Sequence, residues 1–331
     1  MKKLKIWQIL FLLLLVAATA RILTQGPSFQ NKSGKIFGTY YNITYQHAEE
    51  LTQHIESVLQ AVDNSLSTFN KKSIITAVNE NRNTPLDNMF LRVFVISQHI
   101  SQLTDGAFDI TVAPLVNAWG FGYKNGLPTD SAAIRQLLQY TGYNKLSYDG
   151  EKIVKQHPET QLDCSAVAKG YACDQVARML ERKGCRNFMV EIGGEIVTKG
   201  TNNKGNEWVI GINKPIEGIA NGELQERLHL SGKSMATSGN YRNYRYENGK
   251  KVSHTIDPRT GYPVEHSLLS ATVIADDCAT ADALATAFMV MGVDKAMQFC
   301  NKNSVDAFFI YSDSTGNLTT CESQGLGNYR R

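Results

Sequence analysis

The chain lacks the spacing patterns of common metal-binding and nucleic-acid-binding proteins. Its six cysteines stand at positions 164, 173, 185, 278, 300 and 321, with no C-x-x-C pair among them. This spacing argues against a metal cluster held by thiolates, and it leaves disulfides and buried free thiols equally open. No dense run of Lys or Arg follows the N-terminus, and a net charge of +3 with a pI near 8.4 is too mild to indicate a polyanion partner. We therefore expect no nucleic acid among the partners.

Several catalytic and architectural signatures are also missing. The chain contains no G-x-x-x-x-G-K-S/T phosphate loop and no G-x-S-x-G nucleophile turn. Helical and extended segments mix without a regular β-α-β alternation, and no repeat of roughly 20 to 50 residues is detectable. The expected fold class is therefore α+β, and an apolar content of 42% suits a globular body with a real core.

The N-terminus has the features of an export segment. Lys2, Lys3 and Lys5 precede an uncharged, mostly apolar run over residues 6–20, and no cysteine follows that run as a site for a lipid. The run is short for a spanning helix, although the next residues could extend it. A cleaved signal and a retained anchor both stay open. We expect an exported protein at the periplasmic face of the inner membrane, whose N-terminus contacts the membrane at least during export.

The composition divides the chain into three parts. Residues 1–23 are interpreted as the signal peptide or membrane anchor. Residues 24–34 are polar and contain Gly and Pro, as is typical of a linker. Residues 35–331 are predicted to form a single domain.

Hydrophobic spacing predicts the elements of that domain. Helices are expected at residues 49–66, 86–104, 131 onward, 170–183, 279–290 and 294–301. Strands are expected at residues 36–45, 188–192, 208–212, 268–275 and 307–311. Residues 106–122, rich in aromatic residues and glycines, are predicted to be a long loop that lines a site.

Residues 254–261 concentrate more polar chemistry than any other stretch. His254, Asp257 and Arg259 accompany Pro258, which fixes its own φ, and Gly261, which permits a positive φ. Polar side chains should therefore project from a shaped loop. An ordinary polar turn would use the same residues, so the segment alone leaves both interpretations open.

Asp282 and Thr286 stand four residues apart in an alanine-rich helical segment, so they share one helix face. Mg²⁺ prefers such oxygen ligands, and two of them make half of a site. Separate capping or helix hydrogen bonds by each residue are the alternative. Lys169-Gly170 at a predicted helix start would suit a phosphate, although a solvated lysine is equally consistent with the sequence.

Two further segments carry glycines or hydroxyl groups. Gly193-Gly194, between Glu191 and Glu195, allows a planar group or another backbone to approach closely, or simply forms a tight turn. Residues 234–241 contain hydroxyl groups without the arrangement of a serine hydrolase, so they fit ligand donors better.

Taken together, these segments resemble the ApbE family of FAD:protein FMN transferases, in order, from about residue 35 to residue 300. The matching segments are residues 37–39, 63–69, 106–115, 163–174, 191–195, 236–241, 254–261 and 281–286. Phe37 stands where the family commonly has Met, and Cys164 stands where Leu is usual. The first departure keeps an apolar wall and the second changes packing only.

The resemblance implies an α+β, T-fold-related domain of mixed sheets with packed helices. It implies a Mg²⁺-dependent transfer of FMN from FAD to a threonine hydroxyl of an acceptor protein, with release of AMP. Known acceptors of the family include subunits of membrane redox pumps. By carry-over, the metal ligands would be Ala166, through its main-chain oxygen, Asp282 and Thr286. The residues that would contact FAD are Phe37, Ser67, Thr68, Phe69, Asp109, Lys169, His254 and Ile256.

We expect His254 to be the base that takes the threonine proton, because it is the only imidazole in these segments. Asp257 is the competing candidate. Two other functions stay open: a protein that binds FAD without turning it over, and a metal-dependent hydrolase that splits FAD into FMN and AMP. The presence of Lys169, His254, Asp282 and Thr286 argues against a protein that only binds FAD, because such a protein needs neither a base nor a metal site.

Overall fold

The computed structural model describes residues 6–24, 27–123, 129–215, 223–240, 244–247 and 250–330. An eight-stranded sheet forms the centre of this part, in the order β1-β2-β5-β6-β9-β12-β13-β14. In that order the strands span Phe29–Ile36, Thr39–Gln46, Phe188–Ile192, Glu195–Lys199, Ser234–Gly239, Leu268–Ala275, Asp306–Ser312 and Leu318–Glu322. All the described strand pairs are antiparallel, and the predicted α+β class is confirmed.

Three two-stranded sheets accompany the main sheet among the described residues. They pair β3 (Leu146–Tyr148) with β4 (Ile153–Lys155), β7 (Trp208–Asn213) with β8 (Leu224–Leu230), and β10 (Tyr244–Glu247) with β11 (Lys250–Ser253). The α-helices are α1 (Ile6–Thr24), α2 (Thr52–Leu66), α3 (Ile74–Asn79), α4 (Asn88–Leu103), α5 (Ala113–Ala118), α6 (Ser131–Leu138), α7 (Ser165–Arg182), α8 (Cys278–Met291) and α9 (Val293–Asn303). Short 3-10 turns are η1 (Ile110–Val112), η2 (Tyr143–Lys145) and η3 (Gln324–Tyr329).

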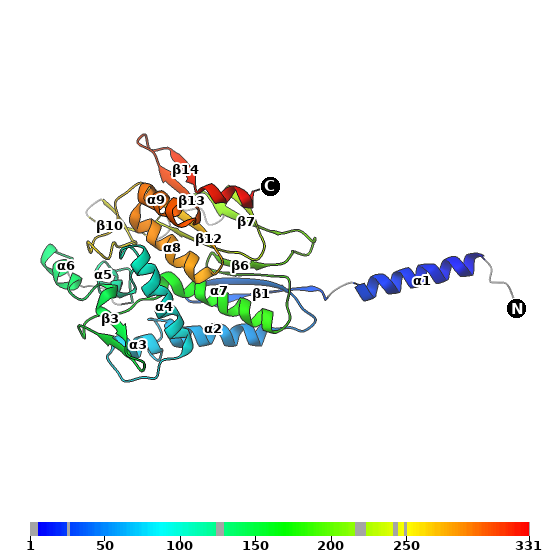
Figure 1. Cartoon of the computed structure of the whole chain (residues 1–331), viewed down its shortest axis with the longest axis horizontal. Helices are drawn as coiled ribbons and strands as arrows, with labels where there is room; N and C mark the ends of the chain where they lie inside the picture. The colour runs from blue at the N-terminus through cyan, green and yellow to red at the C-terminus, as the bar shows by residue number, and fades with distance from the viewer. Residues whose placement is uncertain are drawn as a thin grey trace.

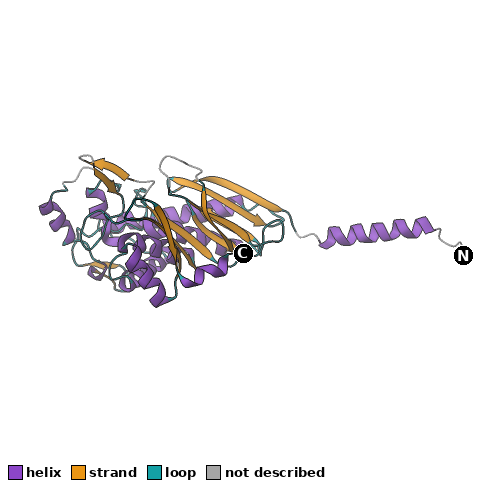
Figure 2. Cartoon of the chain, turned by 90° about the horizontal axis from the view of Figure 1, so that it is seen from above, coloured by secondary structure: helices purple, strands orange, loops and turns teal. Residues whose placement is uncertain are grey.

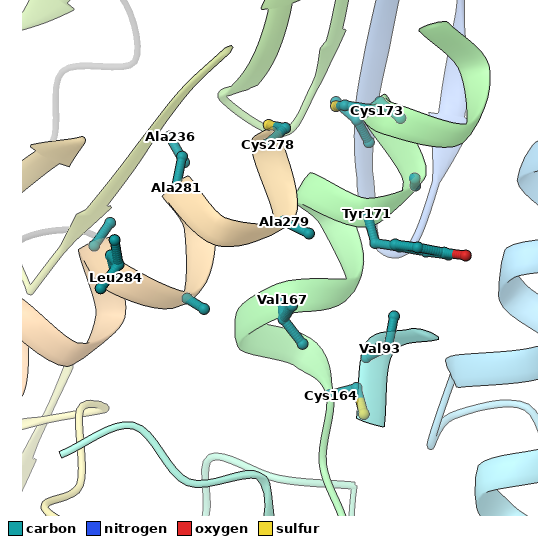
Figure 3. Close-up of a cluster of buried hydrophobic side chains, with 14 of the residues drawn as sticks. Val93, Cys164, Val167, Tyr171, Cys173, Ala236, Cys278, Ala279, Ala281 and Leu284 are labelled. Atoms are coloured by element: carbon teal, nitrogen blue, oxygen red, sulfur yellow. The ribbon is translucent and has the colours of Figure 1, made fainter. Parts of the chain in front are cut away.

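The two faces of the main sheet are covered differently. Helices α7 and α8 pack on one face, with α2 and α4 behind them, and enclose the main apolar core. Figure 3 shows the part of this core where α7 and α8 meet, with Val167 and Tyr171 facing the helix that carries Val93. On the other face, the β7–β8 hairpin packs Trp208 and Leu228 against the sheet. The strands lie side by side with the helices along one side (Figure 2).

Helix boundaries follow the local capping signals. Asp87 accepts a hydrogen bond from Phe90 N at 2.7 Å and starts α4, and Asp130 caps α6 in the same way at the predicted position. Helix α7 begins at Ser165, after the N-cap residue Cys164, and Asp163 accepts from Ser165 N at 2.8 Å just before it. Lys169 and Gly170 therefore lie inside α7 and not at its start, and the predicted placement at a free helix N-terminus was wrong.

Two other boundary predictions were wrong. Residues 29–34 were assigned to a linker, but they belong to β1, which pairs with β2 along its whole length. The strand is polar because it lies at an edge of the sheet, where side chains remain in water. Residues 106–122 do not form one loop: Asp109 caps η1, and Pro114 in the first turn of α5 suits a helix start.

Helix α1 lies apart from the folded body (Figure 1). Among the described helices, none combines the length and the apolar character that a membrane crossing requires. The six cysteines are free thiols, and five of them are buried.

Candidate functional site

A cavity of about 630 Å³ opens at a gap in the main sheet. The pairing of β6 with β9 extends only over Ile196 with Met235 and Val197 with Ser234, while β9 continues to Gly239. The chain turns away before β6 at Gly193-Gly194, and both glycines have positive φ, which a side chain would disfavour. The end of β9 that extends beyond its pairing with β6, the turn before β6 and the first turns of α7 surround the cavity.

The cavity gathers predicted residues from five separate parts of the chain. The predicted site residues that line it are Phe69, Asp109, Ala166, Lys169, His254, Ile256, Asp282 and Thr286. Tertiary folding has therefore brought the proposed base, the proposed metal ligands and the lysine to one place.

Four predicted residues do not line the cavity. Phe37 adopts φ 52° in the turn between β1 and β2 and packs against the main core. Ser67 and Thr68 follow α2, where the Ser67 carbonyl accepts from Ser73 Oγ at 2.7 Å. Their neighbour Phe69 does reach the cavity, with 71% of its surface exposed, and packs edge-on to Tyr123. Of the three predicted residues of this segment, only Phe69 reaches the cavity.

Asp257, the competing candidate for the base, also faces away from the cavity lining. Its Oδ1 accepts from Arg259 N and Nε at 2.9 Å, and its Oδ2 accepts from Arg259 Nη2 at 2.8 Å. Its main-chain oxygen accepts from Gly261 N at 2.8 Å. The carboxylate therefore closes the turn, and Arg259 braces it.

His254 precedes this braced turn and lines the cavity. Its ring lies edge-on to Phe121, with ring centroids 6.3 Å apart. The adjacent Thr255 donates from Oγ1 to Asn240 Oδ1 at 2.6 Å, which fixes the backbone next to the histidine. Trp119 Nε1 donates to Gly261 O at 2.8 Å and fixes the other end of the segment. The backbone segment that begins at His254 is thus fixed at two points beside the cavity.

Three charged side chains meet at the base of the cavity. Lys169 Nζ lies 3.2 Å from Glu195 Oε1 and 3.7 Å from Asp282 Oδ2. The two carboxylates are almost fully buried, with 3% and 2% of their side chains exposed, whereas the lysine retains 29%. Asp282 Oδ2 also accepts from Gly170 N at 3.0 Å. Glu195 was not among the predicted site residues, although its place directly after Gly193 and Gly194 was an available signal.

Burial changes the proton affinity of this group. Desolvation by burial raises the pKa of Glu195 and the nearby charge of Asp282 adds to the rise, while the charge and the hydrogen bond of Lys169 act against it. Burial alone would lower the pKa of Lys169, but the charges of Asp282 and Glu195 outweigh it and raise that pKa. Lys169 therefore stays cationic.

Hard oxygen atoms lie beside these charges. Thr286 Oγ1 is 3.2 Å from Ser238 Oγ, and Asp282 stands one turn earlier on α8. Ala166, in the first turn of α7, lines the same cavity. The described residues contain no group of three or more His, Cys, Asp or Glu side chains that could hold a metal ion by themselves. A cation here would need hydroxyl, main-chain or ligand oxygens in addition to Asp282.

Asp109 lines the cavity with its carboxylate already engaged. Its Oδ1 accepts from Thr111 N at 2.8 Å and Thr111 Oγ1 at 2.7 Å, and its Oδ2 accepts from Tyr143 N at 2.7 Å. Burial raises the pKa of Asp109, against the lowering effect of these bonds. Its observed contacts brace the loop between α4 and α5.

Comparison with known proteins identifies the family of the chain. The sequence profile of the ApbE family matches residues 37–309. The FAD:protein FMN transferase of Haemophilus influenzae is 38% identical over 311 residues, which cover 88% of this chain and 89% of that protein. The FAD:protein FMN transferase of Vibrio cholerae is 36% identical over 318 residues, covering 91% and 94%.

Solved structures give the same result. The flavin transferase ApbE from Vibrio cholerae superposes with a TM-score of 0.82 at 34% identity, covering 92% of this chain and 99% of that one. The apo form of the Pseudomonas stutzeri flavinyl transferase ApbE also gives 0.82, at 31% identity, covering 92% and 98%. The chain therefore belongs to the ApbE family, as its motifs predicted, and is a transferase enzyme.

Proposed function

We propose that this chain transfers the FMN part of FAD to a threonine hydroxyl of an acceptor protein and releases AMP, with Mg²⁺ as the required ion. The names of its relatives support flavin transfer from FAD to a protein. The observation that carries the proposal is the convergence of His254, Lys169, Asp282 and Thr286 on one cavity. The threonine, the AMP product and the ion are our assignments.

The residues present fit a hard divalent cation. Glu195 Oε2 is buried without a hydrogen-bond partner among the described residues, so the base of the cavity has more negative charge than its donors satisfy. Asp282, Thr286 and the main-chain oxygen of Ala166 would hold Mg²⁺, which prefers oxygen ligands. When bound, the ion would neutralise charge on the diphosphate of FAD.

The protein's own groups then handle the substrate. The threonine oxygen forms a bond to the phosphorus on the FMN side, and the bond from that phosphorus to the bridging oxygen breaks, so AMP leaves with the electron pair. His254 accepts the hydroxyl proton in this step. Lys169 supplies a fixed positive charge at the base of the cavity, near which the anionic diphosphate would lie. Apolar walls at Phe121 and Ile256 limit the access of water, which favours threonine as the acceptor.

The location and the acceptor follow from the N-terminus and the family. Lysines before an apolar helix support export, and the exposed apolar side chains of α1 are consistent with a segment that meets a membrane. We propose that the enzyme acts at the periplasmic face of the inner membrane, anchored or cleaved, on a subunit of a membrane redox pump.

A single incubation tests the reaction. The purified chain is mixed with FAD, Mg²⁺ and a threonine-bearing acceptor fragment, and mass spectrometry follows the acceptor, FMN and AMP. We expect an FMN-sized mass gain on the acceptor, together with AMP, and neither with Asp282→Asn. Free FMN without labelled acceptor would instead identify an FAD hydrolase. Bound FAD with no product would identify a simple binding protein.

A further inference from the structure

Lys169 is shared unequally between two buried carboxylates on different elements. The ammonium, from α7, lies 3.2 Å from Glu195 Oε1 at the start of β6 and 3.7 Å from Asp282 Oδ2 on α8. The longer distance exceeds that of a direct hydrogen bond. Asp282 Oδ2 takes its close bond from Gly170 N instead, at 3.0 Å. The lysine is therefore drawn toward Glu195.

The unequal sharing has a consequence for the proposed cation. A cation bound to Asp282 and the Lys169 ammonium would compete for the same carboxylate, because both are positive and both need its oxygens. Glu195 provides the ammonium with another buried partner, so Asp282 keeps an oxygen free for a ligand.

We propose that Glu195 is a positioning residue that holds the Lys169 ammonium away from Asp282 and thereby sets the affinity of the site for Mg²⁺. The inference rests on the proposed function, since it assumes a cation at Asp282. Glu195 acts through Lys169, without touching the cation. Burial fixes the Glu195 side chain beside the turn at Gly193 and Gly194. Its Oε2 lies so close to this turn that a Cβ added to Gly193 would stand 3.4 Å from it.

Glu195→Gln keeps the size of the side chain and removes the charge that attracts the lysine. Titration calorimetry with MgCl2, on the full chain with FAD present, measures the effect. We expect the dissociation constant for Mg²⁺ to rise about tenfold or more, the range that supporting partners of metal ligands usually contribute. Glu195→Asp, which keeps the charge, should recover most of the affinity. A matched control is Glu181→Gln on α7, the helix that carries Lys169. This change breaks the exposed pair of Glu181 with Lys199 of β6 and should leave Mg²⁺ binding unchanged.

A double-mutant cycle separates this role from a direct effect of the Glu195 charge on the cation. With Lys169→Met in place, Glu195→Gln should no longer weaken Mg²⁺ binding, because the competing ammonium is gone. The same loss with and without Lys169 would overturn the proposal. Circular dichroism establishes that each variant is folded.

A crystal structure of the Glu195→Gln variant without metal gives a second test that does not depend on the Lys169 variant. We expect Lys169 Nζ to move within hydrogen-bond distance of the Asp282 carboxylate. An ammonium that remains where it is now would contradict the inference. If the parent chain itself gives no heat with MgCl2, the proposed metal site fails. If the parent binds Mg²⁺ and Glu195→Gln binds it equally well, only the positioning role fails.

Discussion

His254 and Asp257 stand three residues apart, yet only His254 lines the cavity. Their difference comes from Arg259, which binds both carboxylate oxygens of Asp257 and turns them into a brace. The sequence left the two residues as rival bases because both can accept a proton and nothing in their spacing ranks them. The ion pair that decides between them is a feature of the folded loop.

The assignment of the base predicts a specific loss. His254→Ala should lower the rate of FMN transfer by about 10² to 10⁴, the usual contribution of a positioned general base, while FAD still binds. Stopped assays of acceptor labelling measure the rate, and flavin fluorescence measures binding. Asp257→Asn is the comparison: it should weaken the turn but keep a rate much closer to that of the parent chain. A full rate with His254→Ala would remove the histidine from the mechanism.

The contact between α7 and α8 sets the geometry of the site at the scale of the element. Lys169 and Gly170 face α8, and a Cβ at Gly170 would lie 2.3 Å from the main-chain oxygen of Cys278. Only glycine lets the two helices approach this closely. The sequence suggested a free helix end that binds phosphate at this point. The observed role is close packing that places Lys169 beside Asp282.

Gly170→Ala should therefore destabilise the protein. We expect a loss of roughly 1–3 kcal/mol, the usual cost of overpacking, because the obstructing atoms belong to the backbone and cannot rotate away. Urea denaturation measures the change, and calorimetry should also show weaker Mg²⁺ binding as the helices separate. Gly327→Ala is a matched control, since a Cβ there meets nothing within 4 Å and its φ is not positive. Equal stability of the two variants would refute the packing argument.

Asp174 joins the same two helices and predicts a pH dependence. It accepts from Cys278 N at 2.9 Å and Ala279 N at 3.0 Å, but burial outweighs these bonds and raises its pKa from 3.8 to about 6. The folded state thus holds the proton more tightly than the unfolded state. Its contribution to stability is fully present below about pH 3.8 and is lost as the pH rises through about 6.

Asp174→Asn, which carries no charge at any pH, makes this shift measurable. Between about pH 4 and about pH 8 the stability of the variant relative to the parent should rise by up to about 3 kcal/mol, from a pKa shift of about two units. Urea denaturation across this range gives the difference. A difference that stays constant with pH would contradict the assignment.

At the scale of the whole molecule, α1 and the folded body are separate (Figure 1). Removal of residues 1–26 should change the free energy of unfolding of the body by less than about 0.5 kcal/mol, since the apolar side chains from Ile6 to Val16 that the structure describes are largely exposed. Flavin transfer by the truncated chain should be unchanged in solution. In cells, fractionation should find the full chain exported and the truncated chain retained. Export of the truncated chain would rule out a signal role for these residues.

The sequence pattern located most helices of the body but fewer of its strands, because apolar periodicity and capping residues act locally whereas strand pairing does not. Asp87 and Asp130 mark their helix starts within a few residues of chain, so α4 and α6 begin close to the predicted positions. The pattern did not predict β1, whose polar residues become a strand only because β2 supplies hydrogen bonds across a hairpin. Edge strands of this kind carry little pattern of their own.

The sequence by itself determined the family, the set of reactive residue types and the helix face shared by Asp282 and Thr286, since four-residue spacing on a helix fixes relative direction. Only the tertiary structure decided which of those residues act together. It turned Asp257 toward Arg259 and joined Lys169 to Glu195 across 26 positions of sequence. It also opened a cavity where the pairing of β6 with β9 ends. The reason is physical: charge pairing and burial depend on distance in space, and spacing along the chain specifies that distance only within a single element.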